Sequence, residues 1–291
     1  MTRYLHLAPA AKSARVVVGE SKVSVAVWDF DPPARVSSFD TILDFGGDRL
    51  AVSDDGQVVL AAAYRRFGLA AYEATDGKPL WQRRDIKRPQ RLSVSHARAA
   101  VYVGTDASAC QVVSLSTGVT IDRLRGVRNV VESPAEPIAF VDRNQPAVVA
   151  LSDFRVITPV PRTTFGFLAA AFGEGMFAVA EAGGPVRCFL LEESRLAWSF
   201  SPPAGVHCLD LAFHPVLQQF VGVLWPYEHG GDKQLVVFDS HGDPSRGMSI
   251  GCPAETCFCM GGSTLLTSTG LFVDPARQDQ RYLWGTRRME G

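Results

Sequence analysis

The 291-residue sequence lacks an excess of charge of either sign. Its 29 Lys and Arg residues are balanced by 30 Asp and Glu residues, which gives a formal net charge of -1 at pH 7. Nucleic acids and anionic membranes attract proteins through accumulated positive charge. The balance therefore excludes a general electrostatic attraction to either, and any such contact has to be local.

The sequence also lacks a long uninterrupted apolar run. The N-terminal stretch MTRYLHLAPAAKSARVVV has no apolar core followed by a small-residue cleavage site, and the most apolar stretch is interrupted by Gly173, Glu174 and Gly175. A signal peptide requires the first feature, and a membrane-spanning helix requires about 20 apolar residues in a row. We therefore expect no signal peptide, no membrane contact and a cytoplasmic location. The richness in alanine, valine and arginine suggests a GC-rich bacterial source.

Common catalytic signatures are absent as well. The sequence contains no G-x-S-x-G, G-x-x-x-x-G-K-[ST], H-E-x-x-H or G-x-G-x-x-G motif. The stretch TDGKP resembles a phosphate-binding loop only in part, because Pro79 stands where a hydroxyl residue is needed. A hairpin turn is the favoured interpretation. We accordingly predict no catalytic residue.

Cysteine is scarce, and the chain is too large to need disulfides for its stability. The six cysteines are Cys110, Cys188, Cys208, Cys252, Cys257 and Cys259. We interpret them as reduced thiols that act as small core residues, and the alternation in ETCFCMGG predicts Cys257 and Cys259 on one face of an inner strand. Thiolates also favour zinc or copper(I), but the Cys-x4-Cys-x-Cys spacing is not that of a standard zinc knuckle. We predict no metal and no cofactor.

What the sequence does contain is a series of short strands. Apolar residues alternate or form runs of four to eight bounded by Gly, Pro, Asp and Asn, and no stretch keeps a helical period for long. One kind of strand recurs, and it ends near Asp29, Glu73, Ser114, Ser152, Leu191, Asp239 and Asp274. The mean interval of about 41 residues, with about four strands in each, is the repeat length of propeller blades. The sequence therefore predicts a single all-β domain over residues 1–291, a β-propeller of seven blades with four antiparallel strands each; six or eight blades are the alternatives.

Individual blades can be assigned from the sequence. In the second blade RLAVS is the innermost strand, followed by QVVLAAAY, GLAAYEA and the outer PLWQRR; in the fifth the order is FGFLAAAF, GMFAVAEA, PVRCFLLEE and LAWSFS. Central strands read as continuous apolar runs, as expected for sheets buried on both faces. The first and last blades also contain all four strands, which predicts a propeller that closes without exchanging a strand between its ends.

Two families of repeat resemble these blades. The segments VAVWDF (Val25–Phe30), LVVFDSHG and LDLAFHP (Leu209–Pro215) resemble WD40 repeats, whereas AYEATDGKPLW (Ala71–Trp81) and LSTGVTIDRL resemble the quinoprotein-type propeller repeat, with Glu73 and Asp76 in place of its usual Asp and Thr. The second resemblance suggests pyrroloquinoline quinone. The outer-strand Trp of that family packs between blades, however, and it recurs in propellers without a cofactor. Trp81, Trp198 and Trp284 are therefore interpreted as packing residues.

The resemblance to these propeller repeats also implies where a partner would bind. In propellers of this kind, the loops from the second to the third strand and from the fourth strand to the next blade emerge on one face. This places the segment Tyr64–Phe67 (YRRF) on one rim with the charged segment Arg83–Arg91. The longest loop of this class is LWPYEHGGDK (Leu224–Lys233), and aromatic residues in long loops on a rigid scaffold are typical recognition elements. We predict partner binding by Tyr64, Arg65, Arg66, Arg84, Lys87, Arg88, Trp225, Tyr227, Glu228 and His229. The cations would select an acidic partner, unless they form only a solvated loop.

The predicted function is a non-catalytic scaffold that binds a protein or peptide through one loop face, in assembly, sensing or regulation. A module of a larger defence or secretion system would have the same features. The alternative is a propeller hydrolase, lyase or quinoprotein with an axial metal or cofactor site, because the histidines of different blades could converge there. They are His6, His96, His207, His214, His229 and His241. A small-molecule ligand is compatible with either function. Nucleic acid is not an expected partner, because RLRGVRNV and GTRRMEG are isolated basic stretches.

Overall fold

The structure, a computed structural model, describes residues 6–21, 23–41, 49–63, 68–105, 109–227 and 231–284, with all their side chains except that of Arg246. It is an all-β, seven-bladed propeller in which each blade is an antiparallel sheet of four strands. The predicted fold is confirmed, and the alternatives of six and eight blades are wrong. Within the described residues every sheet consists of four consecutive strands, and the first and last blades each contain all four of their own strands, as predicted.

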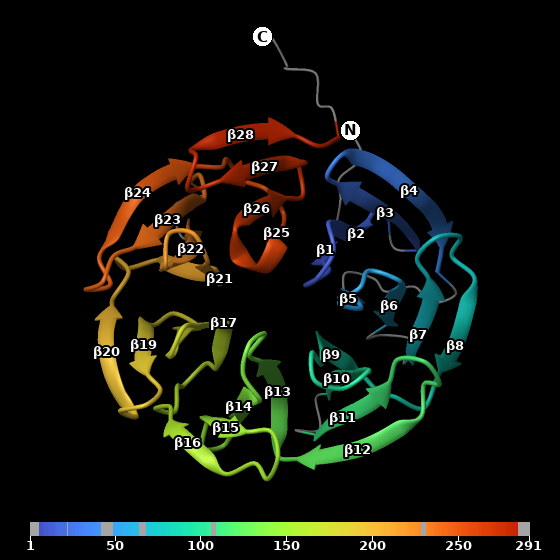
Figure 1. Cartoon of the computed structure of the whole chain (residues 1–291), viewed down its shortest axis with the longest axis horizontal. Helices are drawn as coiled ribbons and strands as arrows, with labels where there is room; N and C mark the ends of the chain where they lie inside the picture. Colours follow the sequence, from blue (N-terminus) through green and yellow to red (C-terminus); the bar gives the residue numbers. More distant parts are fainter. Residues whose placement is uncertain are drawn as a thin grey trace. The chain divides into compact units, whose positions relative to one another are not determined.

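The chain divides into two compact units: residues 1–130 with 268–270 and 282–291, and residues 131–267 with 271–281. The first unit holds three complete blades, shown in blue to green in Figure 1. Their strands are β1 (His6–Pro9), β2 (Arg15–Gly19), β3 (Ser24–Phe30) and β4 (Pro33–Asp40); β5 (Arg49–Val52), β6 (Val58–Ala63), β7 (Gly68–Glu73) and β8 (Pro79–Arg83); β9 (Pro89–Val94), β10 (Ala100–Thr105), β11 (Ala109–Ser114) and β12 (Thr120–Arg125).

The second unit holds most of blade four, blades five and six, and most of blade seven; Val127–Val130 of β13 belong to the first unit. Their strands are β13 (Val127–Glu132), β14 (Ile138–Arg143), β15 (Ala147–Ala150) and β16 (Val156–Pro159); β17 (Phe167–Gly173), β18 (Met176–Glu181), β19 (Val186–Leu190) and β20 (Arg195–Phe200); β21 (Val206–His214), β22 (Gln219–Pro226), β23 (Gln234–Phe238) and β24 (Pro244–Ser249); β25 (Thr256–Cys259), β26 (Thr264–Thr267), β27 (Leu271–Asp274) and β28 (Asp279–Tyr282), with a short 3-10 turn η2 (Met260–Gly262). That residues 1–291 fold as one domain stays a prediction.

The third strand of each blade is the strand whose recurrence the sequence predicts. Strands β7, β11 and β27 end at the predicted anchors Glu73, Ser114 and Asp274, and the other four third strands end within two residues of theirs. All four strands of blade two and of blade five lie where the sequence placed them. The signal was clear because the second and third strands are apolar on both faces: five of the six residues are buried in β6 and likewise in β7.

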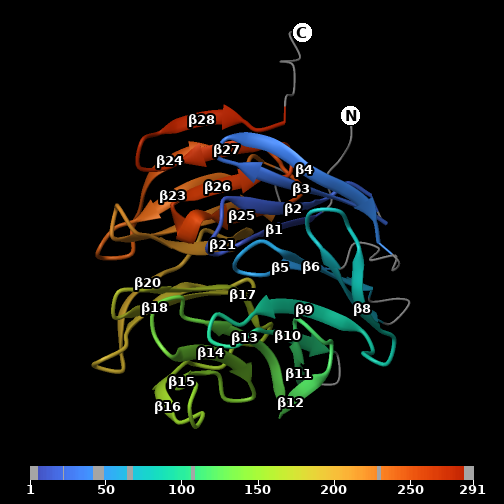
Figure 2. The ribbon, with the colours of Figure 1, turned by 45° about the vertical axis from the view of Figure 1, so that its right-hand side comes forward.

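Successive sheets pack face to face within each unit. Side chains of the first two blades share one core, which includes Val17 and Val27 from blade one and Val59 and Tyr72 from blade two. Equivalent cores join blades two and three, four and five, five and six, and six and seven. In Figures 1 and 2 the sheet β21–β24 accordingly lies beside the sheet β25–β28. Each blade thus buries both faces of its central strands, which explains their unbroken apolar pattern.

Aromatic residues of the outer strands pack on glycines of the next blade. In β8, Trp81 lies against Gly118 of blade three, and in β20, Trp198 lies against Gly242 of blade six; both glycines have a positive φ, +70° and +86°. The Trp81 indole N–H also donates to the carbonyl oxygen of Leu115 at 2.7 Å. A side chain on either glycine would collide with the indole, so only glycine fits at this position of the turn. The interpretation of Trp81 and Trp198 as packing residues agrees with these contacts.

The cysteines lie mostly in the core. All six are free thiols, of which Cys252 alone is exposed. Cys257 and Cys259 share one face of β25, with their Sγ atoms 3.8 Å apart, as the alternation predicted. Within the described residues no helix has the length and apolarity that a membrane span requires.

Candidate functional site

An apolar groove lies between blades five and six, and we call it the Trp225 groove. Its volume is about 370 Å³ and its accessible lining is entirely apolar. The residues that line it are Phe165, Leu168, Ala182, Gly183, His207, Leu209, Trp225 and Tyr227. It therefore offers a partner mainly hydrophobic contact.

The groove is built by residues at the ends of strands, on the side of the blades where the second-to-third and fourth-to-first connections emerge. Phe165 and Leu168 lie where the chain enters β17, Gly183 lies in the turn between β18 and β19, and Tyr227 follows β22. These are the fourth-to-first and second-to-third connections of their blades, the class for which the resemblance to known propellers predicted recognition. The backbone N–H of Tyr227 donates to the carbonyl oxygen of Gly205 at 2.8 Å, which ties this segment to the start of β21.

Three rings fix the wall on the side of blade six. Trp225 and Tyr227 meet edge to face, with centroids 4.9 Å apart and an interplanar angle of 88°, and Tyr227 meets His207 in the same way at 5.7 Å. His207 lies opposite Trp225 in the β21–β22 ladder. Its Nδ1 accepts the backbone N–H of Gly183 at 3.1 Å. This bond links the wall to the hairpin of blade five and places the ring proton of a neutral His207 on Nε2.

Lys233 supports the wall from behind. Its ammonium group lies 5.3 Å from the centre of the Trp225 ring, and it donates to the carbonyl oxygen of Pro253 at 2.8 Å. The residue is buried, and this burial lowers the pKa of the Lys233 ammonium, against the opposing effect of nearby acidic groups. A cation over the face of an indole is attracted to it, so Lys233 restrains Trp225 in its groove-lining position.

Asp210, in β21 beside this wall, has a pKa raised well above its ordinary value. The pKa of Asp210 is raised to about 7: exclusion from water is the main cause and the charge of Glu255 adds to it, while a backbone N–H from Leu211 and the charge of Lys233 act in the opposite direction. Its Oδ1 accepts the Leu211 N–H at 3.0 Å. The charge state of this carboxyl group therefore changes near neutral pH.

The structure brings together only part of the predicted aromatic cluster. Trp225 and Tyr227 both line the groove, although Trp225 belongs to β22 and not to the loop in which the sequence placed it, because it pairs across from His207. Glu228 and His229 lie outside the described residues. Phe165, Leu168 and Leu209 were missed. Phe165 could have been found in the sequence as an aromatic residue that directly precedes Gly166 where the chain enters a blade. Its side chain is 79% exposed.

The predicted charged rim is a structured loop. Arg84, Lys87 and Arg88 are exposed between β8 and β9, whereas Ile86 is fully buried in the core between blades two and three. Arg83 donates to the Asp85 carboxylate and to the carbonyl oxygen of Gly118, each at 2.5 Å at the closest. The loop is thereby held against blade three. Tyr64, Arg65 and Arg66 lie outside the described residues.

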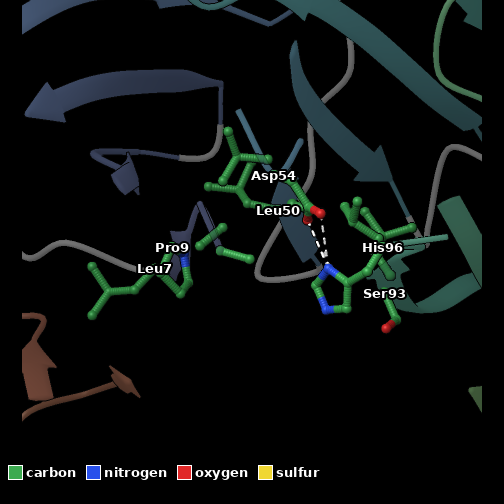
Figure 3. A pocket seen from close by; sticks show the side chains of 12 residues that line it. Leu7, Pro9, Leu50, Asp54, Ser93 and His96 are labelled. Carbon is green, nitrogen blue, oxygen red and sulfur yellow. Dashed lines mark hydrogen bonds and ion pairs between the residues drawn. The ribbon is translucent and has the colours of Figure 1, made fainter. Parts of the chain in front are cut away.

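A second hollow, the inner-strand cavity, lies among the first strands of blades one to three. Its volume is about 290 Å³, and apolar residues of β1, β5 and β9, among them Leu7, Leu50 and Leu92, line it together with polar groups. Figure 3 shows the Asp54 carboxylate facing the imidazole of His96 across this cavity. Both Asp54 oxygens lie 2.9 Å from His96 Nδ1, and the Lys12 Nζ atom lies 3.2 Å from Oδ2 of the same carboxylate.

The polar side of this cavity resembles half of a catalytic arrangement. A carboxylate only accepts hydrogen bonds, so Nδ1 of His96 carries the proton and the ring is oriented by Asp54. Ser93 also lines the cavity, but in Figure 3 its hydroxyl points away from His96. The geometry thus contains an imidazole oriented by a carboxylate, and Ser93 is not placed to act with it as a nucleophile. Among the described residues, no three His, Cys, Asp or Glu side chains are placed to hold a metal ion.

Comparison with known proteins gives a likeness of fold. No family model matches the sequence, and no curated protein sequence matches it. A chain in the crystal structure of the mitotic checkpoint complex superposes with a TM-score of 0.72 over 95% of this chain and 85% of that chain, at 12% sequence identity. At this identity the likeness shows the propeller fold alone, and neither of the two repeat families that the sequence resembles is shown as the family of this chain.

Proposed function

We propose that the protein is a non-catalytic scaffold that binds a protein or peptide partner through the Trp225 groove. The observation that carries the proposal is an exposed, entirely apolar groove whose wall is built from Trp225 and Tyr227. Apolar hollows of this kind on a protein surface mark interaction sites more often than scattered exposed residues do. Trp and Tyr are also the residue types most enriched at the energetic centres of interfaces.

Three apolar side chains of the groove remain in contact with water. Phe165 is 79% exposed and Tyr227 is 60% exposed, and Leu168 beside them is 37% exposed. Covering a large apolar side chain contributes about 1.5–3 kcal/mol, so a partner that covers these three gains several kcal/mol. The wall is fixed before binding by the contacts with His207 and Lys233, which reduces the entropy lost when a partner binds.

The solved structure with a similar fold supports a protein as the ligand. That chain belongs to the mitotic checkpoint complex, so the fold is one that takes part in protein assembly. A protein or peptide that inserts an apolar side chain between Phe165 and Trp225 is the partner that fits the groove. No charged group is needed at the point of insertion, because the accessible lining is apolar.

The test is a comparison of partner capture by four forms of the protein. Trp225→Ala and Phe165→Ser open or polarise the groove, and Val216→Ser is the matched control, because Val216 is 77% exposed and lies outside the groove. We expect quantitative mass spectrometry of affinity-purified samples to show a partner that the wild type and Val216→Ser retain, and that both groove variants lose about tenfold or more. A photo-crosslinking residue in place of Tyr227 should attach to that same partner. Equal recovery by all four forms contradicts the proposal.

A second candidate function is an enzyme or small-molecule binder that uses the inner-strand cavity. The observation in its favour is the imidazole of His96 held by Asp54 in a cavity of about 290 Å³. Native mass spectrometry with metal analysis of protein purified from its own source distinguishes the two. A bound small molecule or metal that His96→Ala loses favours the cavity, whereas a stoichiometric protein that Trp225→Ala loses favours the scaffold.

A further inference from the structure

We propose that β12 and the loop between β8 and β9 form a second docking surface, which binds an extended acidic segment of a partner protein along the outer edge of β12. This surface lies in the first unit and shares no residue with the Trp225 groove. The proposal therefore stands independently of the function proposed above.

Positive charge is concentrated in two segments of an otherwise balanced chain. The segment 83–91 has five cations and one anion, and the segment 119–128 has three cations and one anion, whereas the whole chain has a net charge of -1. Within them, Arg84, Lys87, Arg123 and Arg125 are all exposed. Such a local excess attracts an acidic partner and speeds its encounter.

The two segments lie side by side in the structure. Arg83, at the end of β8, reaches the carbonyl oxygen of Gly118 at 2.5 Å, in the turn before β12, and the Thr120 hydroxyl at 3.4 Å, at the start of β12. Arg123 is close enough to Asp85 that, after the larger effect of Arg83, its charge helps to lower the pKa of the Asp85 carboxyl group. The cations of the loop and those of the strand therefore form one surface.

The outer edge of β12 is open in the described structure. The sheet order is β12-β11-β10-β9, so β12 is terminal and pairs only with β11 among the described strands. Four other outer strands, β4, β8, β16 and β24, contain proline at their ends, which removes a backbone donor at an edge. Strand β12, with the sequence TIDRLR, has none. It can add a strand that pairs through its backbone.

The exposed face of β12 determines the chemistry of that added strand. Val119, directly before β12, and Ile121, at a bulge in the pairing with β11, are 57% and 54% exposed, and Arg123 and Arg125 beyond the bulge are exposed as well. Cations on an edge oppose pairing with a second basic strand, but they favour an acidic one. The occupant that fits is an extended peptide with carboxylates opposite Arg123 and Arg125 and an apolar residue near Ile121. A nucleic acid matches this face less well, because a phosphate backbone offers nothing to Val119 and Ile121.

A fluorescein-labelled peptide of alternating Glu and Val tests the proposal in binding measured by fluorescence anisotropy. We expect the wild-type protein to bind this probe. The Arg123→Glu/Arg125→Glu variant should bind it at least about tenfold more weakly. The matched control is Arg195→Glu, on the outer strand β20, which also contains no proline; it should bind as the wild type does. Trp225→Ala should also bind this probe normally, so a failure here is separate from a failure of the groove.

Two further probes decide the mode and the class of ligand. A version of the peptide N-methylated at every residue has no backbone N–H on either edge and cannot donate a ladder of hydrogen bonds, and we expect it to bind much more weakly than the parent. A single-stranded oligonucleotide of the same charge should bind more weakly than the peptide. Equal binding of the N-methylated probe, tighter binding of the oligonucleotide, or no loss in the charge-reversed variant would each overturn the proposal. A circular dichroism spectrum like that of the wild type shows that the variant is folded.

Discussion

Asp54 and His96 are 42 residues apart and occupy the turn after the first strand in successive blades, where their side chains meet at 2.9 Å. Lys12 completes this contact from the corresponding turn of blade one, with an ion pair of 3.2 Å and a backbone N–H that donates to the Asp54 carbonyl oxygen at 2.9 Å. One carboxylate thus joins three blades within the first unit. A repeat fold places equivalent positions side by side, so one residue can bridge both neighbours.

The first prediction concerns this carboxylate. Asp54→Asn keeps the shape of the side chain but removes its charge, and we expect a loss of about 1–3 kcal/mol in the free energy of unfolding, since hydrogen bonds to charged groups are worth about that much. Chemical denaturation measures it. Asp153→Asn is the control, because Asp153 is exposed, its ion pair with Arg155 is 4.0 Å long, and its other contacts are local, the closest being the Arg155 backbone N–H that donates to Oδ1 at 3.0 Å. An equal loss in both variants would show that the bridge adds no stability.

The second prediction concerns the glycine under Trp81. Gly118→Ala would place a Cβ atom 2.6 Å from the indole, at a φ of +70°, whereas Gly126→Ala has a similar φ of +73° and nothing within 4 Å. Both variants carry the strain of a positive φ, about 1 kcal/mol. Only Gly118→Ala adds the collision, so we expect it to lose at least about 1 kcal/mol more than Gly126→Ala in thermal or chemical unfolding. Equal losses would mean that Trp81 moves aside without cost.

The third prediction is a dependence of stability on pH through Asp210. The pKa of this carboxyl group is about 7 in the folded protein, compared with an ordinary value of 3.8. The protonated form is favoured by folding, so the stabilisation is complete below about pH 4 and is lost as the pH rises through about 7. Asp210→Asn should flatten this part of the curve and make the variant more stable than the wild type at pH 8. A wild-type curve that rises between pH 4 and 7, and that the substitution leaves unchanged, would contradict the assignment.

The fourth prediction concerns thiol reactivity. Cys252 is the exposed thiol, whereas the other five are buried, and burial raises the pKa of Cys110 and of Cys188 to about 12. Because the thiolate is the reactive form, iodoacetamide should label one cysteine in the native protein and all six in denaturant. Cys252→Ser should remove the native labelling. Rapid native labelling of Cys257 or Cys259, read by peptide mass spectrometry, would show that blade seven opens in solution.

The sequence by itself determined the fold because that fold repeats a local pattern. Apolar runs such as VVLAAA in β6 are continuous since both faces of the strand are buried, and the recurrence of such runs at about 41-residue intervals gives the blade count. Turn-forming residues mark the strand ends, which is why β7 ends at the predicted Glu73. These signals act over a few residues and can be read without knowing what packs against them.

The sites were decided only by the tertiary structure, because they join residues that are far apart in the chain. Trp225 and Tyr227 were suspected as aromatic residues near a long loop, but their groove also needs Phe165 and Leu168 from the preceding blade. Nothing near Asp54 in the sequence points to His96 or Lys12, and the three meet only because successive blades stack in register. Packing between sheets, and not the pattern along a strand, determines which side chains share a surface.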